Sequence, residues 1–146
     1  RMPVFLNKTF RTWITPHMSE FKRLFPNIKE SNNIELALRA SKEFGISILL
    51  KGAHSIIADS NGTAWQIYET DEDSARAGLG DLLSGFVSGM AAFELASGKK
   101  ISAEYFARYA LMHSYAASQC SKGSSASKIG EELAILVRQI KMRQMS

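Results

Sequence analysis

The apolar positions of residues 33–44 recur every three or four residues, as on one face of an amphipathic helix. Gly45 follows directly and is a natural end for that helix. A shorter helix is expected over Ser19–Phe25, because Ser19 is a plausible N-cap and Pro26 stops the helix. The N-terminal part of the chain is therefore predicted to contain both of these helices.

Four other apolar segments lack this spacing and predict strands. Residues 12–17 (TWITPH) resemble a short buried strand ending at Pro16, and residues 46–50 (ISILL) form a nearly continuous apolar run. Such a run is typical of a strand buried on both faces, in a sheet covered by helices. Asn61-Gly62 separates the segments HSIIAD and TAWQIYE and is a strong hairpin signal.

The rest of the chain is predicted to be helical. One helix starts near Asp81, a second covers about Ser102–Ser118 and a third about Ser127–Lys141. Predicted strands alternate with helices in the N-terminal part of the chain, and helices follow one another in the C-terminal part. This is the pattern of an α/β layered domain. Because 146 residues suit one domain, we expect a single α/β domain over residues 1–146.

Composition and charge narrow the class of protein. With 45% hydrophobic and 22% charged residues, the composition is that of an ordinary globular protein. The net charge is +4, but no basic stretch is interleaved with aromatic residues, so we expect no nucleic-acid partner. The cations Arg138, Lys141 and Arg143 complement the dipole of the last helix. Serine, glycine and charged residues interrupt the apolar runs, so we expect no membrane-spanning segment.

The single cysteine, Cys120, excludes a disulfide within the chain and fits a reducing compartment. No signal peptide is visible, and we expect a cytoplasmic protein. The chain begins with Arg1 rather than methionine, close to the first predicted strand. We therefore expect the domain to be part of a longer polypeptide and incomplete at its N-terminal side.

The segment Gly78-Leu79-Gly80-Asp81 stands at the start of the first late helix. Glycines let the backbone approach a ligand, and a helix N-terminus offers unpaired N–H groups. Together they form an anion-binding site suited to phosphate. Asp81 is either the N-cap of the helix or a base that takes a proton from an attacking hydroxyl. Small residues along the helix would permit close packing against a sheet: Gly85, Ser88, Gly89 and Ala92.

Two further segments place polar residues at strand ends, where α/β sheets bind ligands. His17 and Glu20 come just after the first predicted strand, and Glu20 either caps its own helix or orients His17. Lys51, Gly52 and Ser55 follow the second strand. They offer phosphates a cation, backbone N–H groups and a hydroxyl.

In order along the chain, TPHMSEF, then KGAHS with its hairpin, then ARAGLGDLLSG resemble the motifs of the ADP/ATP-dependent NAD(P)H-hydrate dehydratase family. The resemblance runs from about Thr15 to the third late helix and matches the C-terminal half of such proteins. It implies a ribokinase-like α/β fold whose N-terminal half is missing, cleaved or on a second chain. It also implies a repair reaction, in which the hydroxyl of hydrated NADH or NADPH is phosphorylated and phosphate then leaves by elimination.

The resemblance implies a role for each matching residue. Asp81 is the implied catalytic base and, with His17, a contact of the hydrate. The implied nucleotide contacts are Lys51, Gly52, Ala53, His54, Ser55, Gly78 and Gly80. ADP or ATP is the implied co-substrate, and we expect ADP. Mg²⁺ would come with the nucleotide phosphates, and no transition-metal site is expected. We also expect a homo-oligomer.

The sequence departs from the family pattern at several positions. Leu79 stands where the family usually has threonine, and Ser55 replaces a threonine but keeps its hydroxyl. Near the C-terminus Lys128 replaces a usual aspartate. Two alternatives stay open: a small-molecule kinase of the same superfold, such as a hydroxymethylpyrimidine or thiazole kinase, and a non-catalytic nucleotide-binding subunit.

Several polar residues have a structural alternative. His113 lies at helical spacing among apolar residues and is interpreted as a buried structural histidine. His54 is either a nucleotide contact or a variable loop residue. An acidic loop is either a solvated connector or a segment near magnesium: Glu69, Asp71, Glu72 and Asp73.

Overall fold

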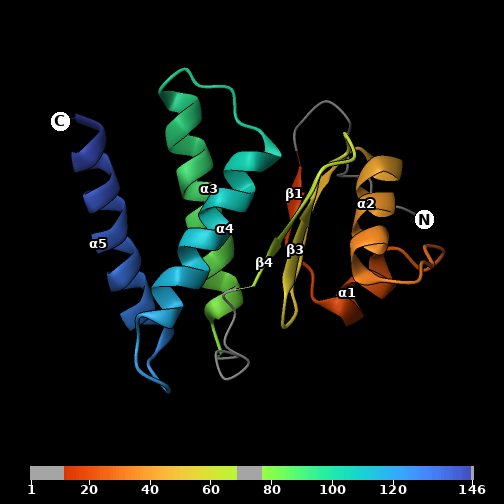
Figure 1. Cartoon of the computed structure of the whole chain (residues 1–146), viewed down its shortest axis with the longest axis horizontal. Coiled ribbons are helices and arrows are strands. Elements are labelled where there is room, and N and C mark those ends of the chain that lie inside the picture. The colour runs from red at the N-terminus through yellow and green to blue at the C-terminus, as the bar shows by residue number, and fades with distance from the viewer. Residues whose placement is uncertain (1–11, 69–76, 146) are drawn as a thin grey trace. The chain divides into compact units, whose positions relative to one another are not determined.

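A computed structural model of the chain describes residues 12–68 and 77–145. The chain divides into two compact units, residues 1–68 and 69–146 (Figure 1). The single domain expected from the sequence stays a prediction.

A four-stranded sheet is the centre of the first unit. Its order is β1 (Trp13–Ile14), β2 (Ser47–Leu50), β3 (Ser55–Ala58) and β4 (Ala64–Ile67). β1 pairs with β2 in parallel, and the two following pairs are antiparallel. The strand predicted over residues 12–17 is shorter than expected, because Pro16 has no N–H group to donate to the next strand. It was also predicted to be buried, but both residues of β1 are only half-buried.

The sheet confirms two predictions from the sequence. β3 and β4 form a hairpin, and the amide of Gly62, at φ +92°, donates to the carbonyl of Asp59 at 3.1 Å. All four residues of β2 are buried. Ile48 and Leu50 belong to the apolar core, and Leu49 between them points to the opposite face. β2 is therefore a strand buried on both faces.

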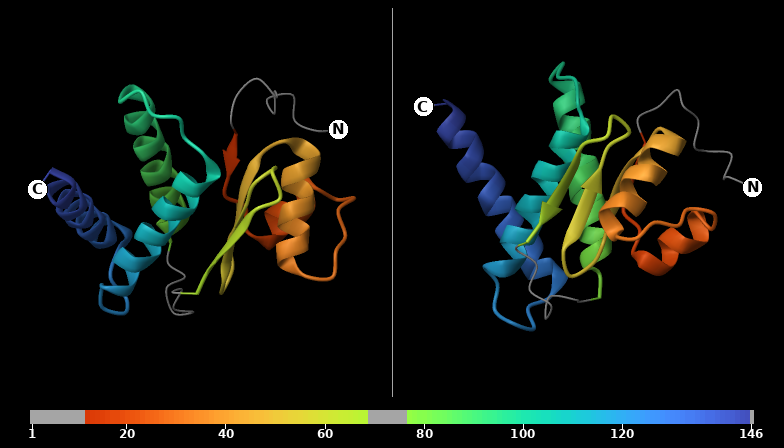
Figure 2. Two further views of the ribbon diagram at one scale, coloured as in Figure 1. Left: turned by 45° about the horizontal axis from the view of Figure 1, so that its top comes forward. Right: turned by 45° about the vertical axis from the view of Figure 1, so that its right-hand side comes forward.

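Helices α1 (Met18–Leu24) and α2 (Asn33–Phe44) complete the first unit. α2 lies along one face of the sheet, as Figures 1 and 2 show. The side chain of Asn32 accepts from the amide of Glu35 at 2.9 Å and begins the helix. Gly45 ends it in the left-handed conformation at φ +66°, as predicted.

The buried hydroxyl of Ser41 links α2 to the sheet by hydrogen bonding. It donates to the carbonyl of Ile46 and lies 3.2 Å from the carbonyl of Ala58 in β3. Ile46 immediately precedes β2, so the hydroxyl of this helix residue lies beside backbone carbonyls of two neighbouring segments of the sheet.

The second unit contains helices α3 (Leu79–Ala96), α4 (Ala103–Ser118) and α5 (Ala126–Met145). They run alternately up and down, and α4 packs against both α3 and α5 (Figure 1). An apolar cluster forms where they meet: Ala116, Ala117, Ile129 and Leu133, with Leu79, Leu82 and Phe86 against it. The three helices predicted for this part of the chain are confirmed, although α3 begins before Asp81.

α3 differs from expectation in two ways. By length and composition alone, α3 is long and apolar enough to cross a membrane, since its 18 residues have a mean hydropathy of 1.2. The prediction that no segment could span a membrane was therefore wrong by this criterion. One such helix is weak evidence for a membrane span, because core helices of globular proteins also meet this criterion. The small residues are exposed, and the helix buries other positions: Leu83, Val87, Ala91 and Glu94. The predicted packing of these small residues was against a sheet, and the sheet belongs to the first unit, so it stays a prediction.

The buried carboxylate of Glu94 joins the end of α3 to α4. The hydroxyl of Tyr109 donates to it at 3.0 Å, and the ammonium of Lys99 lies 2.7 Å from its other oxygen. Burial, reinforced by the bond to Glu94, raises the pKa of Tyr109. Tyr109 therefore stays protonated and acts as the donor in this contact.

Candidate functional site

The structure brings the TPH and KGAHS segments together at one edge of the sheet. The amide of Lys51 donates to the carbonyl of Pro16 at 2.8 Å, and His17 and Lys51 form an isolated parallel bridge. β1 and β2 are parallel, so their carboxyl ends lie at the same edge. The predicted placement of both segments at strand ends is confirmed.

The carboxylate of Glu20 links His17 and Lys51. It accepts from the backbone amide of His17 at 2.8 Å, and the same oxygen lies 4.0 Å from Nζ of Lys51. The other oxygen lies 3.4 Å from Nε2 of His17. The bond from the His17 amide lowers the pKa of Glu20, and the charge of Lys51 lowers it further. Glu20 therefore stays ionised beside the cation.

His17, not Ser19, is the N-cap of α1. Nδ1 of His17 accepts from the amide of Glu20 at 3.3 Å and lies 2.8 Å from the hydroxyl of Ser19. With the carboxylate of Glu20 returning to the His17 amide, this is a capping box. The prediction of Ser19 as the N-cap was wrong, because a ring nitrogen can replace the usual hydroxyl as the acceptor. Both alternatives for Glu20 hold, since it caps α1 and orients His17.

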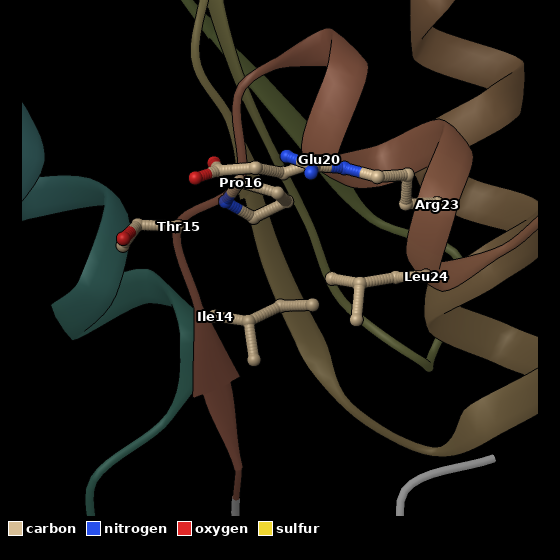
Figure 3. A pocket seen from close by; sticks show the side chains of 6 residues that line it. All are labelled: Ile14, Thr15, Pro16, Glu20, Arg23 and Leu24. Carbon is tan, nitrogen blue, oxygen red and sulfur yellow. The ribbon is translucent and has the colours of Figure 1, made fainter.

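A cavity of about 380 Å³ adjoins this cluster (Figure 3). Ile14 and Leu24 lie on one side of it, and Glu20 and Arg23 on the other. Arg23 was not among the residues predicted for the site. Arg23 follows Glu20 by three residues on a helix, so the two side chains share a face, and this spacing could have indicated Arg23 from the sequence.

The connection from β2 to β3 presents the predicted phosphate-binding groups. Gly52, Ala53 and His54 are exposed, and Ser55 begins β3. The hydroxyl of Ser55 lies 3.4 Å from the carbonyl of Gly52, which keeps it within the same turn. A cation, exposed backbone and a hydroxyl therefore occur within one short loop, as a bound phosphate requires.

In the second unit, the Gly78-Leu79-Gly80-Asp81 segment forms the start of α3. Gly78 is the N-cap at φ +85°, a backbone conformation that glycine adopts at no steric cost. Asp81 is the third residue of the helix and is exposed, so the N-cap alternative for it is wrong. Within residues 12–68 and 77–145, no side chain or backbone group pairs with its carboxylate. The catalytic role implied for Asp81 stays a prediction.

Asp81 also borders a groove of about 650 Å³ between α3 and α5. The groove is lined by apolar side chains such as Phe86 and Leu133, with Asp81 and Arg138 as its charged residues. A ligand that reached Asp81 along this groove would meet an apolar wall beside a single carboxylate.

The departures from the family pattern have structural explanations. The side chain of Leu79 packs against the apolar cluster of the second unit, where a threonine would bury less apolar surface. Lys128 is exposed and pairs with Glu131 at 3.1 Å and Glu132 at 3.8 Å on α5. The acidic residues 69 and 71–73 lie outside the described residues.

Comparison with known proteins identifies the family. A family model described as NAD(P)H-hydrate dehydratase matches residues 4–137. The chain belongs to this family. The bifunctional NAD(P)H-hydrate repair enzyme Nnr of Synechocystis is 37% identical over 91 residues, which are 62% of this chain and 17% of that protein. The ADP-dependent (S)-NAD(P)H-hydrate dehydratase of Nitrosopumilus maritimus is 42% identical over 93 residues, 61% of this chain and 31% of that protein.

Solved structures establish the fold. The ADP/ATP-dependent NAD(P)H-hydrate dehydratase from Bacillus subtilis, co-crystallised with ATP and Mg²⁺, matches with a TM-score of 0.73 at 20% identity, over 88% of this chain and 48% of that one. A ribokinase-like superfamily protein from Enterococcus faecalis matches with a TM-score of 0.74 at 23% identity, over 92% and 49%. The predicted ribokinase-like α/β fold is confirmed, and the chain spans about half the length of these structures.

Proposed function

We propose that this chain is part of an enzyme that uses a nucleotide, preferably ADP, to dehydrate hydrated NADH or NADPH back to the reduced cofactor. The observation that carries the proposal is the bond from Lys51 to Pro16, which holds the TPH segment beside the KGAHS loop. Family membership and the names of the relatives from N. maritimus and B. subtilis support it. Because the chain spans only part of those proteins, we propose that a further segment or a second chain completes the site.

The predicted residues divide between two tasks in this proposal. Lys51 and the loop Gly52–Ser55, which includes Ala53 and His54, bind the nucleotide phosphates, as do Gly78 and Gly80. The cation neutralises phosphate charge, and backbone N–H groups donate to phosphate oxygens. His17 contacts the hydrate, and Asp81 acts on its hydroxyl.

The chemistry has two stages. Asp81 takes the proton of the hydrate's hydroxyl, whose oxygen attacks the terminal phosphorus of the nucleotide. The bond from that phosphorus to the bridging oxygen breaks, and the nucleotide leaves one phosphate shorter. The C–O bond of the phosphorylated ring then breaks, inorganic phosphate departs with the bonding electrons, and the neighbouring ring carbon loses a proton. The ring double bond is restored.

We propose that magnesium comes with the nucleotide. Phosphate oxygens and water would supply most of its ligands, as is usual for Mg²⁺. Among residues 12–68 and 77–145, no three histidine, cysteine, aspartate or glutamate side chains come together as a metal site. When bound, it would neutralise phosphate charge.

Two further expectations belong to this proposal. A cytoplasmic location is proposed because the chain has a single cysteine and therefore needs no disulfide. A homo-oligomer is proposed as well, and light scattering of the longest native form of the protein tests it.

The deciding experiment is turnover of hydrated NADH, followed by the absorbance of the reduced nicotinamide. ADP and ATP are compared in parallel with magnesium present, on this chain and on the longest native form of the protein. Recovery of NADH with one nucleotide establishes the reaction and identifies the phosphate donor. Nucleotide binding without recovery in the long form favours the non-catalytic subunit, whereas phosphorylation of a hydroxymethylpyrimidine or thiazole alcohol favours the kinase.

A further inference from the structure

Tyr68, which directly follows β4, presents an aromatic ring to solvent beside the KGAHS loop. Among the large hydrophobic side chains of residues 12–68 it is the most exposed, at 71%. The centroid of its ring lies 5.4 Å from that of the His54 ring, and the two ring planes are inclined at 45°. The loop that is proposed to bind the nucleotide phosphates therefore has an exposed aromatic surface at its side.

Strand pairing explains why the two rings meet. Ser55 lies opposite Ile67 in the antiparallel pair of β3 and β4. His54 and Tyr68 are the next residues outward at the open end of the hairpin, so they lie opposite each other on one face of the sheet. The ring contact is therefore fixed by the register of the hairpin, and a slip of one residue would turn the rings to opposite faces.

The ring of Tyr68 is also held at its hydroxyl. This group donates to Oε1 of Gln66 at 2.9 Å, two residues earlier on the same face of the hairpin. A ring that is held by both His54 and Gln66 has little conformational freedom left to lose when a ligand binds. Because aromatic rings attract other flat rings by stacking, Tyr68 offers a preorganised surface to such a ring.

The order of the strands places four polar or aromatic residues in a row along one edge of the sheet. His17 comes after β1, Lys51 after β2, His54 just before β3 and Tyr68 after β4. Neighbouring strands lie about 4.8 Å apart, so His17 and Tyr68 are at opposite ends of the row, with Lys51 between them. A nucleotide with its phosphates at Lys51 and its terminal phosphate toward the hydrate at His17 would extend its base toward Tyr68.

We propose that the ring of Tyr68, held by His54, binds the base of the nucleotide by stacking, with the nucleotide lying across the strand ends. This role rests on the proposed function for the position of the phosphates, and it deepens that function by assigning the base. Stacking of a base on an aromatic side chain contributes enough affinity for loss of the ring to weaken binding about tenfold to a hundredfold.

Two probes separate the base from the phosphates: ADP, and pyrophosphate, which has neither base nor ribose. Isothermal titration calorimetry measures both affinities with magnesium present, on the longest native form of the protein. Tyr68→Ala removes the ring, whereas Tyr68→Phe keeps the ring and removes only the hydroxyl. Tyr115→Ala is the matched control, because it removes another exposed tyrosine, on α4 in the second unit. Lys51→Met reports on the phosphate contact.

We expect Tyr68→Ala to weaken ADP binding about tenfold to a hundredfold and to leave pyrophosphate binding within about twofold of the wild type. Tyr68→Phe should bind ADP nearly as the wild type does, and Tyr115→Ala should change neither affinity. Lys51→Met should weaken both probes by a similar factor, because it acts on the phosphates alone. Unchanged ADP binding in Tyr68→Ala, or an equal loss for both probes, overturns the inference.

A second measurement needs no variant. In the wild type saturated with ADP, stacking predicts nuclear Overhauser effects between the ring protons of Tyr68 and those of adenine, and their absence overturns the inference. Turnover of hydrated NADH is measured separately. Turnover with an ADP affinity that does not depend on Tyr68 retains the proposed function and removes the base site. No turnover with an affinity that does depend on Tyr68 does the reverse, and a wild type that binds no ADP overturns both.

Discussion

The backbone amide of Lys51 donates to the carbonyl of Pro16 at 2.8 Å, although the two residues belong to motifs that are far apart in the sequence. The bond extends the parallel pairing of β1 and β2 beyond the end of β1. It sets the side chain of Lys51 beside Glu20 and His17, at the edge where α/β sheets bind ligands. Because a backbone bond makes this junction, side-chain substitutions at Lys51 test ligand binding with little disturbance of the sheet.

Lys51→Met should weaken ADP binding by about tenfold to a hundredfold, which corresponds to the loss of one hydrogen bond to a charged group. Isothermal titration calorimetry with ADP measures the effect. Lys42→Met, which removes an exposed lysine of α2 in the same unit, is the control and should bind ADP as the wild type does. Equal affinity of the Lys51 variant and the wild type would remove Lys51 from the phosphate site.

Asp81→Asn should lower kcat by about a hundredfold to ten-thousandfold, because an amide cannot accept the proton of the attacking hydroxyl. Nucleotide affinity should change little, since a carboxylate is an unfavourable phosphate ligand. Stability should also hold, because Asp81 is exposed and Gly78, not Asp81, is the N-cap of α3. Glu131→Gln, an exposed carboxylate on α5, is the matched control and should retain its turnover. An Asp81→Asn enzyme with near-normal kcat would show that another group is the base.

Ser41→Ala should lower the free energy of unfolding by about 1–3 kcal/mol. The substitution removes the hydroxyl that donates to the carbonyl of Ile46 and lies 3.2 Å from the carbonyl of Ala58. Urea denaturation of the longest native form measures the change, and Ser60→Ala, at an exposed serine of the hairpin, should leave the midpoint unmoved. If both variants unfold at the same urea concentration, the hydroxyl of Ser41 does not stabilise the contact between α2 and the sheet.

The stability of the second unit should fall in acid because of His113. Burial lowers its pKa from 6.5 to about 4 in the folded chain. Its neutral form therefore stabilises the fold fully above pH 6.5, and this contribution is lost as the pH falls toward 4. The full loss is about 3 kcal/mol.

A comparison with His113→Asn isolates this titration from that of the carboxylates, because asparagine does not ionise. The difference in unfolding free energy between the wild type and this variant should shift against the wild type between about pH 7 and pH 4.5. A difference that stays constant over this range would mean that His113 is not buried as a neutral ring.

Local patterns in the sequence were sufficient for most helices and strands. The continuous apolar run of residues 46–50 identified β2, Asn61-Gly62 identified the hairpin, and Gly45 identified the end of α2. These features depend on backbone preferences and on burial of one segment at a time, which neighbouring residues encode. The same patterns failed where a side chain acted outside its usual role, as with His17 in place of Ser19 as the cap of α1.

By itself, the sequence determined the elements, the ribokinase-like fold expected from the order of its motifs, and the residue types near each strand end. Only the tertiary structure decided which of these residues meet: that the amide of Lys51 bonds to Pro16, that Arg23 lies beside Glu20 at a cavity, and that Tyr109 donates to Glu94. The physical reason is that contacts between distant segments depend on strand pairing and helix packing, where a shift of one residue turns a side chain to another face.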